Sequence, residues 1–327
     1  MVRRILAVFE PFVLMLLGTV LLASLLPPVG RAAIVFGWAA DAGIVLLFFL
    51  HGARLSRDAI VEGLRNWRLH LAVFATTFAL FPLLGIAVAH LPLLAPTLAG
   101  GFLFLTLLPS TVQSSIAFTS IARGNVAAAV CSASFSNLAG IVLTPALVAL
   151  TMQGMAGAGQ AHVSLAQAEG IVLQLLAPFV IGHLMRPLVG AWIARRRALV
   201  TTVDRGSILL VVYTAFGAAV ADGLWRRGTG GDLAMLLALC AALLAVVLAV
   251  TWYGAKALRL PRGDAIVLLF CGSKKSLAAG VPMAGVLFPA AQVGLAILPV
   301  MLFHQIQLIA CAVIARRLGA AAPADAD

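Results

Sequence analysis

A short polar run, Cys271-Gly272-Ser273-Lys274-Lys275-Ser276, interrupts an apolar stretch in the last third of the 327-residue chain. Lys274 lies ten residues after Asp264, which is about 15 Å along a helix and half the thickness of the hydrocarbon layer. Each lysine at that depth costs about 2.5–3.5 kcal/mol on insertion scales, so the pair indicates a function. Both lysines can bind a substrate carboxylate, or they can supply the positive charge that a bound cation supplies in other proteins. The alternative is that they snorkel to the interface.

A second polar run, Pro109-Ser110-Thr111-Val112-Gln113-Ser114-Ser115, interrupts an earlier apolar stretch. Pro109 frees a backbone carbonyl, which together with nearby hydroxyls can bind a cation such as Na⁺, and a half-helix N-terminus can bind an anionic group. The alternative is that small polar residues merely allow close helix packing in lipid. We predict a substrate or ion site lined by the polar residues of both runs and of the helices that follow the first: Ser110, Thr111, Gln113, Ser114, Ser115, Thr119, Ser132, Ser134, Asn137, Cys271, Ser273, Lys274, Lys275 and Ser276.

The composition is that of a membrane protein. Hydrophobic residues make up 63% of the chain, charged residues 10%, and the mean hydropathy is +1.11. The net charge of +11 is explained by arginines in cytoplasmic loops, so no nucleic-acid partner is expected. Four cysteines fall in apolar runs without CxxC spacing, and no HExxH, GxSxG or Walker motif is present. The sequence predicts neither an enzyme nor a resident cofactor.

Apolar runs predict an all-α protein of ten membrane spans, which lie at about 5–26, 32–52, 69–90, 97–122, 126–151, 168–190, 204–222, 232–256, 264–288 and 291–315. With both termini in the cytoplasm, 17 basic residues lie inside and three (Arg31, Arg226 and Arg227) lie outside. This asymmetry satisfies the positive-inside rule and predicts a multi-pass protein of the inner (plasma) membrane.

The two polar runs predict an internal repeat. Without gaps, Ser110-Thr111 aligns with Gly272-Ser273, Gln113 with Lys275 and Ser114 with Ser276. Both runs lie in the middle of a span, and the fourth and ninth spans cross the membrane in opposite directions. Interrupted helices at matching positions of two inverted five-helix repeats are typical of a transporter with its site at the membrane midplane.

These motifs, with Arg123-Gly124-Asn125, Gly140-Ile141-Val142-Leu143-Thr144-Pro145 and Gly280-Val281-Pro282-Met283, resemble the bile acid:sodium symporter family (solute carrier family 10 type). Within it the chain is similar to the SBF-like branch of bacterial proteins related to the seventh human member. The resemblance spans nearly the whole chain. It implies a panel domain at about 1–53 and 168–222, a core domain at about 69–151 and 232–317, and fourth and ninth spans that are discontinuous and cross. Sodium sites would lie behind the crossing, and the substrate would lie between the domains.

The resemblance also implies where sodium ligands would fall. The serine of a sodium-binding Ser-Asn pair falls on Ser115, whereas its asparagine falls on Ile116. The ninth-span glutamate falls on Cys271 and the following glutamine on Lys275, and a third-span glutamine falls on Thr77. Ser115 and Thr77 thus remain as candidate Na⁺ ligands. We expect the loss of the carboxylate and the gain of two ammonium groups to weaken Na⁺ binding, because a buried cation needs anionic or carbonyl oxygen.

The best prediction is a secondary active transporter that moves a small organic anion by alternating access, with Na⁺ as the coupling ion that the resemblance implies. One alternative is a sodium-independent or proton-linked carrier. Another is a membrane regulator that transports nothing. The expected partners are the organic anion and the lipid bilayer; the sequence does not predict an oligomeric state.

Overall fold

The computed structural model describes residues 11–54, 66–152, 165–221 and 230–321; the predicted cytoplasmic termini lie partly outside these ranges. The described residues form helices and no strands. The first half holds α2 (Pro11–Leu25), α3 (Arg31–Arg54), α5 (Trp67–Ala75), the π-helix η1 (Thr76–Leu80), α6 (Phe81–Ala89), α7 (Pro96–Leu107), α8 (Gln113–Ile121) and α9 (Val126–Thr151). The second half holds α10 (Leu165–Arg195), α11 (Arg197–Ala221), α13 (Gly230–Ala257), α14 (Arg262–Gly272), α15 (Leu277–Leu287) and α16 (Ala290–Ala320).

Eight helical stretches of the described chain are long and apolar enough to cross a membrane. Two of them are composite: α5, η1 and α6 form one, and α14 with α15 forms another. The apolar helices α2 and α7 are shorter. Large apolar side chains remain on the outside, such as Leu83 (65% exposed) and Leu188 (80% exposed), as is expected where lipid is the solvent.

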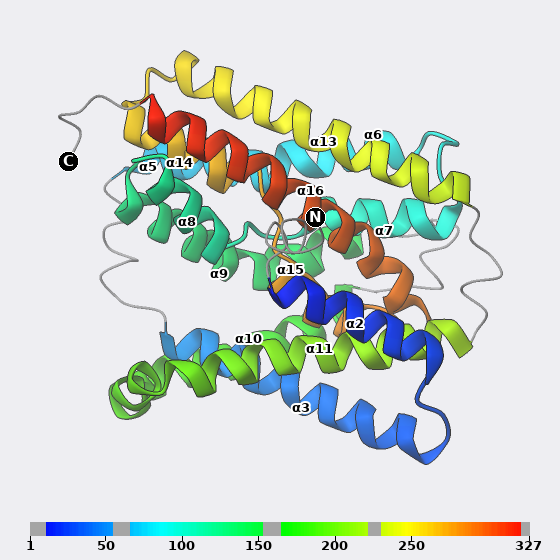
Figure 1. The fold of residues 1–327 in the computed structure, drawn as a ribbon. Helices are drawn as coiled ribbons and strands as arrows, with labels where there is room; N and C mark the ends of the chain where they lie inside the picture. The colour runs from blue at the N-terminus through cyan, green and yellow to red at the C-terminus, as the bar shows by residue number, and fades with distance from the viewer. Residues whose placement is uncertain (1–10, 55–65, 153–164, 222–229, 322–327) are drawn as a thin grey trace, which may run out of the picture.

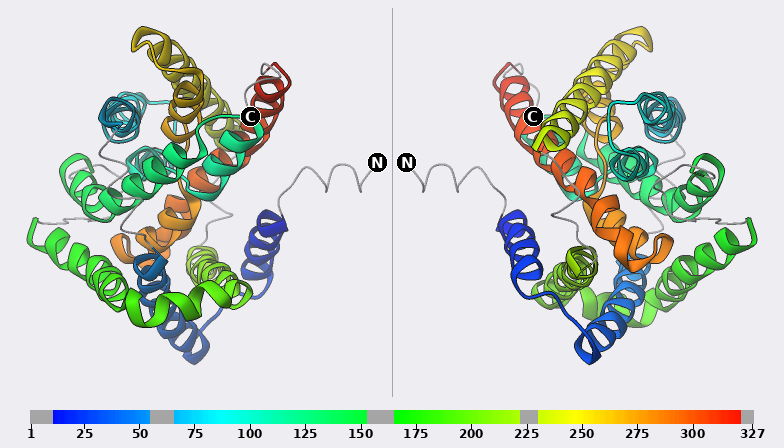
Figure 2. Two further views of the ribbon diagram at one scale, coloured as in Figure 1. Left: turned by 90° about the vertical axis from the view of Figure 1, so that its left-hand side faces the viewer. Right: turned by 90° about the vertical axis from the view of Figure 1, so that its right-hand side faces the viewer.

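The helices form two groups, which Figures 1 and 2 show from three directions. In the lower group of Figure 1, α3 packs against α10 and α11, and α2 packs against α11. In the upper group α16 contacts α7, α8 and α13, while α14 contacts α5, α8, α9 and α13. The groups meet where α11 packs against α15 and α16 and where α10 packs against α9.

Glycines set the closest approach in the lower group. A methyl group at Gly52 of α3 would lie 1.9 Å from the carbonyl oxygen of Phe179, and one at Gly182 of α10 would lie 2.0 Å from that of Phe49. Small residues that let two backbones approach are a common basis of helix packing in lipid.

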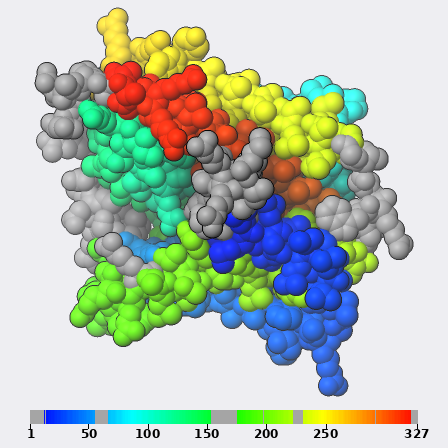
Figure 3. Space-filling model, viewed as in Figure 1, coloured from blue at the N-terminus to red at the C-terminus, as the bar shows by residue number. Residues whose placement is uncertain are grey.

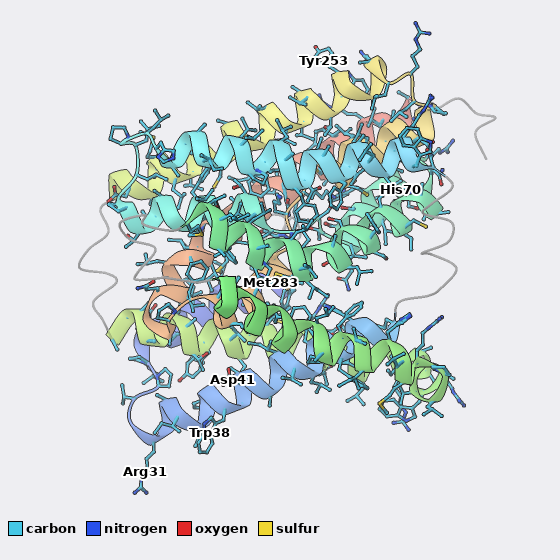
Figure 4. All side chains as sticks on the ribbon, turned by 180° about the vertical axis from the view of Figure 1, so that it is seen from behind. Arg31, Trp38, Asp41, His70, Tyr253 and Met283 are labelled. Carbon is cyan, nitrogen blue, oxygen red and sulfur yellow. The ribbon has the colours of Figure 1, made fainter. Side chains whose placement is uncertain are left out.

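Outer faces carry aromatic residues: Trp38 on α3 and Tyr253 on α13 project from opposite sides of the molecule in Figure 4, and both are exposed. Helix α2 lies at the surface in Figure 3.

Both polar runs interrupt a helix, as the sequence predicts. Helix α7 ends at Leu107 and α8 begins at Gln113; α14 ends at Gly272 and α15 begins at Leu277. Pro109 lacks the N–H that would continue α7. The Ser276 hydroxyl caps α15 by accepting the N–H of Ala279 at 3.1 Å.

Candidate functional site: two helix breaks and two buried lysines

The two helix breaks hydrogen-bond to each other. The backbone N–H of Ser276 donates to the carbonyl oxygen of Pro109 at 2.9 Å. In return, the Ser110 hydroxyl donates to the carbonyl of Cys271 at 2.5 Å, and the Thr111 hydroxyl to that of Lys275 at 2.8 Å. Broken helices are tolerated at membrane depth only where protein groups satisfy the freed backbone, and here each break supplies the other.

Helix α9 satisfies three further backbone groups of the first break. Thr144 donates its hydroxyl to the carbonyl of Leu107 at 2.8 Å, and the Asn137 amide donates to the carbonyl of Ser110 at 2.8 Å. The Ser136 hydroxyl accepts the N–H of Ser110 at 3.0 Å. The predicted polar position Asn137 therefore acts on the backbone of the break.

Gln307 of α16 satisfies the second break. Its Oε1 accepts the backbone N–H of Lys275 at 3.0 Å, and its Nε2 donates to the carbonyl of the same residue at 3.0 Å. Nε2 also lies 2.8 Å from His304 Nδ1. Because Gln307 is fully buried, this amide holds the unwound segment in place through the peptide units on both sides of Lys275.

The Lys275 side chain ends in a cage of backbone carbonyls. Its Nζ donates to the carbonyl oxygens of Thr77 at 2.8 Å, Thr106 at 2.8 Å and Leu108 at 2.6 Å. The Phe81 ring lies beneath it, with its centroid 4.2 Å from Nζ. A lysine ammonium has three N–H donors, which is the number of carbonyl oxygens in contact with this Nζ. Lys275 is fully buried.

Local backbone structure explains why these carbonyls are free. In the π-helix the N–H of Phe81 bonds to the carbonyl of Thr76, five residues earlier. In that register the partner of the Thr77 carbonyl is Pro82, which has no N–H. The carbonyls of Thr106 and Leu108 lie where α7 ends, so they have lost their helical donors too.

Lys274, the adjacent residue, has a different environment. Its Nζ is buried and makes no hydrogen bond with the described residues. It lies 3.9 Å from the centroid of the Phe118 ring and 5.3 Å from that of Phe270, so ring quadrupoles stabilise it. The hydroxyls of Ser114 and Thr119, on the same helix as Phe118, are likewise buried without a partner in the described structure.

The segments that surround the two lysines contain no carboxylate side chain. The chain has no Asp or Glu from 66 to 152 or from 265 to 321, the segments that form both breaks and their surroundings. The ion pair between Arg54 and Asp204, at 2.6 Å, lies in the other group of helices. In the described part of the chain, no cluster of three or more His, Cys, Asp or Glu side chains could hold a metal ion. Carbonyl oxygens surround the Lys275 Nζ, and aromatic rings lie next to both Nζ atoms.

The structure brings most of the predicted polar residues to the two breaks. Besides those above, Ser115 donates its hydroxyl to the carbonyl of Phe270 at 3.2 Å, and Ser273 donates to Leu269 of its own helix. Ser132 instead pairs with His70 Nδ1 at 2.7 Å. Ser134 is half-buried on α9, and Gln113 is exposed at the start of α8.

The two candidate sodium ligands are both engaged through their side chains. The hydroxyl of Ser115 bonds to Phe270, and that of Thr77 donates to the carbonyl of Val73 at 2.8 Å. Cys271 is buried, with Sγ 3.8 Å from the carbonyl oxygen of Ala129. In this region the group that the carbonyls surround is the Nζ of Lys275.

Sequence reasoning missed three parts of the site: Gln307, Phe81 and the π-helix Thr76–Leu80. An amide in the middle of an apolar span, three residues after His304, is a signal that could have identified Gln307. The π-helix has a weaker signal in Pro82, because a proline inside a span frees a carbonyl. No pattern in the sequence pairs Phe81 with Lys275.

A cavity of about 260 Å³ lies where the two groups of helices meet. Asp41 and Ile44 of α3 line it, with Val211 and Thr214 of α11. The upper group contributes Gly285, near the end of α15, among its lining residues. Asp41 is labelled in Figure 4, and its side chain is exposed. The cavity thus adjoins the helix that starts at the second break.

Comparison with known proteins identifies the family. The model of the SBF-like CPA transporter family (DUF4137) matches residues 10–320. The chain is 54% identical to uncharacterized protein PA2026 of Pseudomonas aeruginosa, over 94% of this chain and 92% of that protein. It is 51% identical to "Putative symporter YfeH" of Escherichia coli (strain K12), over 96% of this chain and 94% of that protein. It is 23% identical to sodium/bile acid cotransporter 7 of Rattus norvegicus, over 81% and 78% respectively. The chain belongs to the SBF-like CPA transporter family and is a multi-pass membrane protein.

Proposed function

We propose that this protein is a secondary active transporter of a small organic anion and that it works by alternating access in the inner membrane, with both termini cytoplasmic. The observation that carries the proposal is the contact between two interrupted helices at their breaks, in a chain of a transporter family. Such breaks place polar backbone and charge at membrane depth, where carriers bind substrates and ions.

The two groups of helices are the two domains that move against each other in the proposed transport cycle. We assign residues of about 1–53 and 168–222 to a panel domain and those of about 69–151 and 232–317 to a core domain. Counting α2 and α7–α8 as spans gives ten spans. We propose that they form two inverted repeats, in which α7–α8 and α14–α15 are equivalent. The cavity between α3, α11, α15 and α16 then lies between the domains, where rocking of one against the other would open it to each side in turn.

The charges in the core favour an anionic substrate. Lys274 and Lys275 are the basic side chains at the breaks, in segments that contain no Asp or Glu. Helices α8 and α15 also begin at the breaks, so the positive ends of their dipoles lie in the same region. The rat relative is named for bile acid and sodium, which makes a bile acid a reasonable first probe.

Counterflow in proteoliposomes tests the proposal, because exchange across the membrane requires alternating access but no ion gradient. Vesicles loaded with an unlabelled bile acid or with short carboxylates should accumulate the labelled compound, and protein-free vesicles should not. Gly285→Trp should abolish the exchange, because it fills the cavity between α15 and α11. Gly254→Trp is the matched control, since no atom lies within 4 Å of the position of its Cβ. Folded protein that exchanges none of these anions would contradict the proposal.

A further inference from the structure

The carbonyl cage around Lys275 has the composition of a monovalent-cation site. Three carbonyl oxygens, from Thr77, Thr106 and Leu108, converge on one nitrogen atom at 2.6–2.8 Å. They come from two elements far apart in the chain, the π-helix and the broken end of α7. Without a cation at their centre, these buried carbonyls would have to lose their solvation with no donor in return.

The three oxygen contacts match the charged form of the lysine better than the neutral form. A neutral amine has two N–H groups and would leave one of the three oxygens without a donor, whereas an ammonium satisfies all three. The Phe81 ring, 4.2 Å away, adds a further surface that favours a cation. Lys275 is itself held by Gln307 through its backbone, so the side chain starts from a fixed point.

We propose that Lys275 is a built-in cation: its ammonium permanently fills a monovalent-cation site formed by the carbonyls of Thr77, Thr106 and Leu108. A carrier built in this way needs no Na⁺ at this position. The conclusion that transport is not coupled to Na⁺ at this position rests on the proposed transport function. The conclusion that Lys275 fills the cage does not rest on it, because occupancy of the cage can be measured on purified protein that transports nothing.

Removing the side chain should uncover the site. In Lys275→Ala the cage becomes open to small cations, so Na⁺ or methylammonium should bind and stabilise the folded protein. At about 200 mM chloride salt, we expect either cation to raise the melting temperature of this variant by about 2 °C or more over choline, with saturation. Wild-type protein should melt at the same temperature in all three salts.

Two variants serve as controls. Lys275→Met removes the charge but fills the space, so it should not respond to Na⁺ or methylammonium. Lys274→Ala removes a lysine that contacts no carbonyl cage, so it should not respond either. These controls separate refilling of the cage from a general effect of salt on a weakened protein.

The melting experiments support or overturn the built-in cation as follows. A Lys275→Ala protein that is stabilised by small cations, or recovered in folded form only in their presence, supports the proposal. A Lys275→Ala protein that no small cation stabilises or restores overturns it. A saturable response of the wild type to Na⁺ equal to that of the variant would also overturn it, because the site would then lie elsewhere.

Discussion

Lys274 and Lys275 are adjacent and both buried, but their side chains differ in the hydrogen bonds that they make. The Lys275 ammonium has all three donors bonded to carbonyl oxygens, whereas the Lys274 ammonium has none bonded and faces two aromatic rings. Neighbours on a regular helix point about 100° apart, but here the backbone between α14 and α15 is unwound. At this break the Lys275 side chain reaches three backbone carbonyls, and the Lys274 side chain reaches two aromatic rings.

This difference assigns the two residues distinct roles. Lys275 belongs to the architecture, because it joins η1, α7 and the second break in one network. Lys274 keeps three unused donors, so it is the lysine with hydrogen-bonding capacity left for another group. Replacing each lysine by methionine removes the charge and keeps most of the side-chain length, and this pair of substitutions can test the division.

Lys275→Met should have the largest effect. It removes three charge-assisted hydrogen bonds and leaves three buried carbonyls without donors, so we expect a loss of about 3–5 kcal/mol in the free energy of unfolding. Thermal melting in detergent, followed by intrinsic fluorescence, measures the loss. Lys256→Met is the control, because Lys256 is the third lysine of the chain and is exposed. Equal melting temperatures for the two variants would mean that the cage contributes nothing.

Gln307→Leu should have an intermediate effect. It leaves the buried N–H and C=O of Lys275 without the Gln307 amide, which predicts a loss of about 2–3 kcal/mol. Gln305→Leu, at a half-buried position of the same helix, should change stability little. Melting of the two variants side by side checks the prediction. If Gln307→Leu melted at the wild-type temperature, the unwound segment would not depend on α16.

Lys274→Met should have the smallest effect, within about 1 kcal/mol of wild type in the same melting experiment. The lost attraction to Phe118 and Phe270 is offset, because a buried ammonium with no hydrogen-bond partner no longer has to be desolvated. A loss of stability as large as that of Lys275→Met would contradict the contrast between the two lysines. It would indicate that Lys274 makes an equally strong interaction.

The sequence predicts the helix breaks well, because Pro109 and the Gly272–Ser276 run are local signals that no regular helix in lipid would carry without reason. It predicts less of what holds the breaks. Lys275 reaches the carbonyls of Thr77 and Thr106, which are 198 and 169 residues away along the chain. Such partners depend on how α5–α7 pack against α14–α15. A single sequence carries no local pattern that predicts this packing. Helix ends are also imprecise, since α10 runs to Arg195, past the predicted end at 190.

Nuclear magnetic resonance of the lysine side chains tests the central claim most directly. The chain has three lysines, so lysine-selective ¹⁵N labelling yields three Nζ signals that single substitutions assign. The cage predicts that Lys275 Nζ carries three protons that exchange slowly with water, and that this signal disappears in Lys275→Met but persists in Lys274→Met. A Lys275 signal with two protons, or one that exchanges as fast as that of Lys256, would contradict the built-in cation.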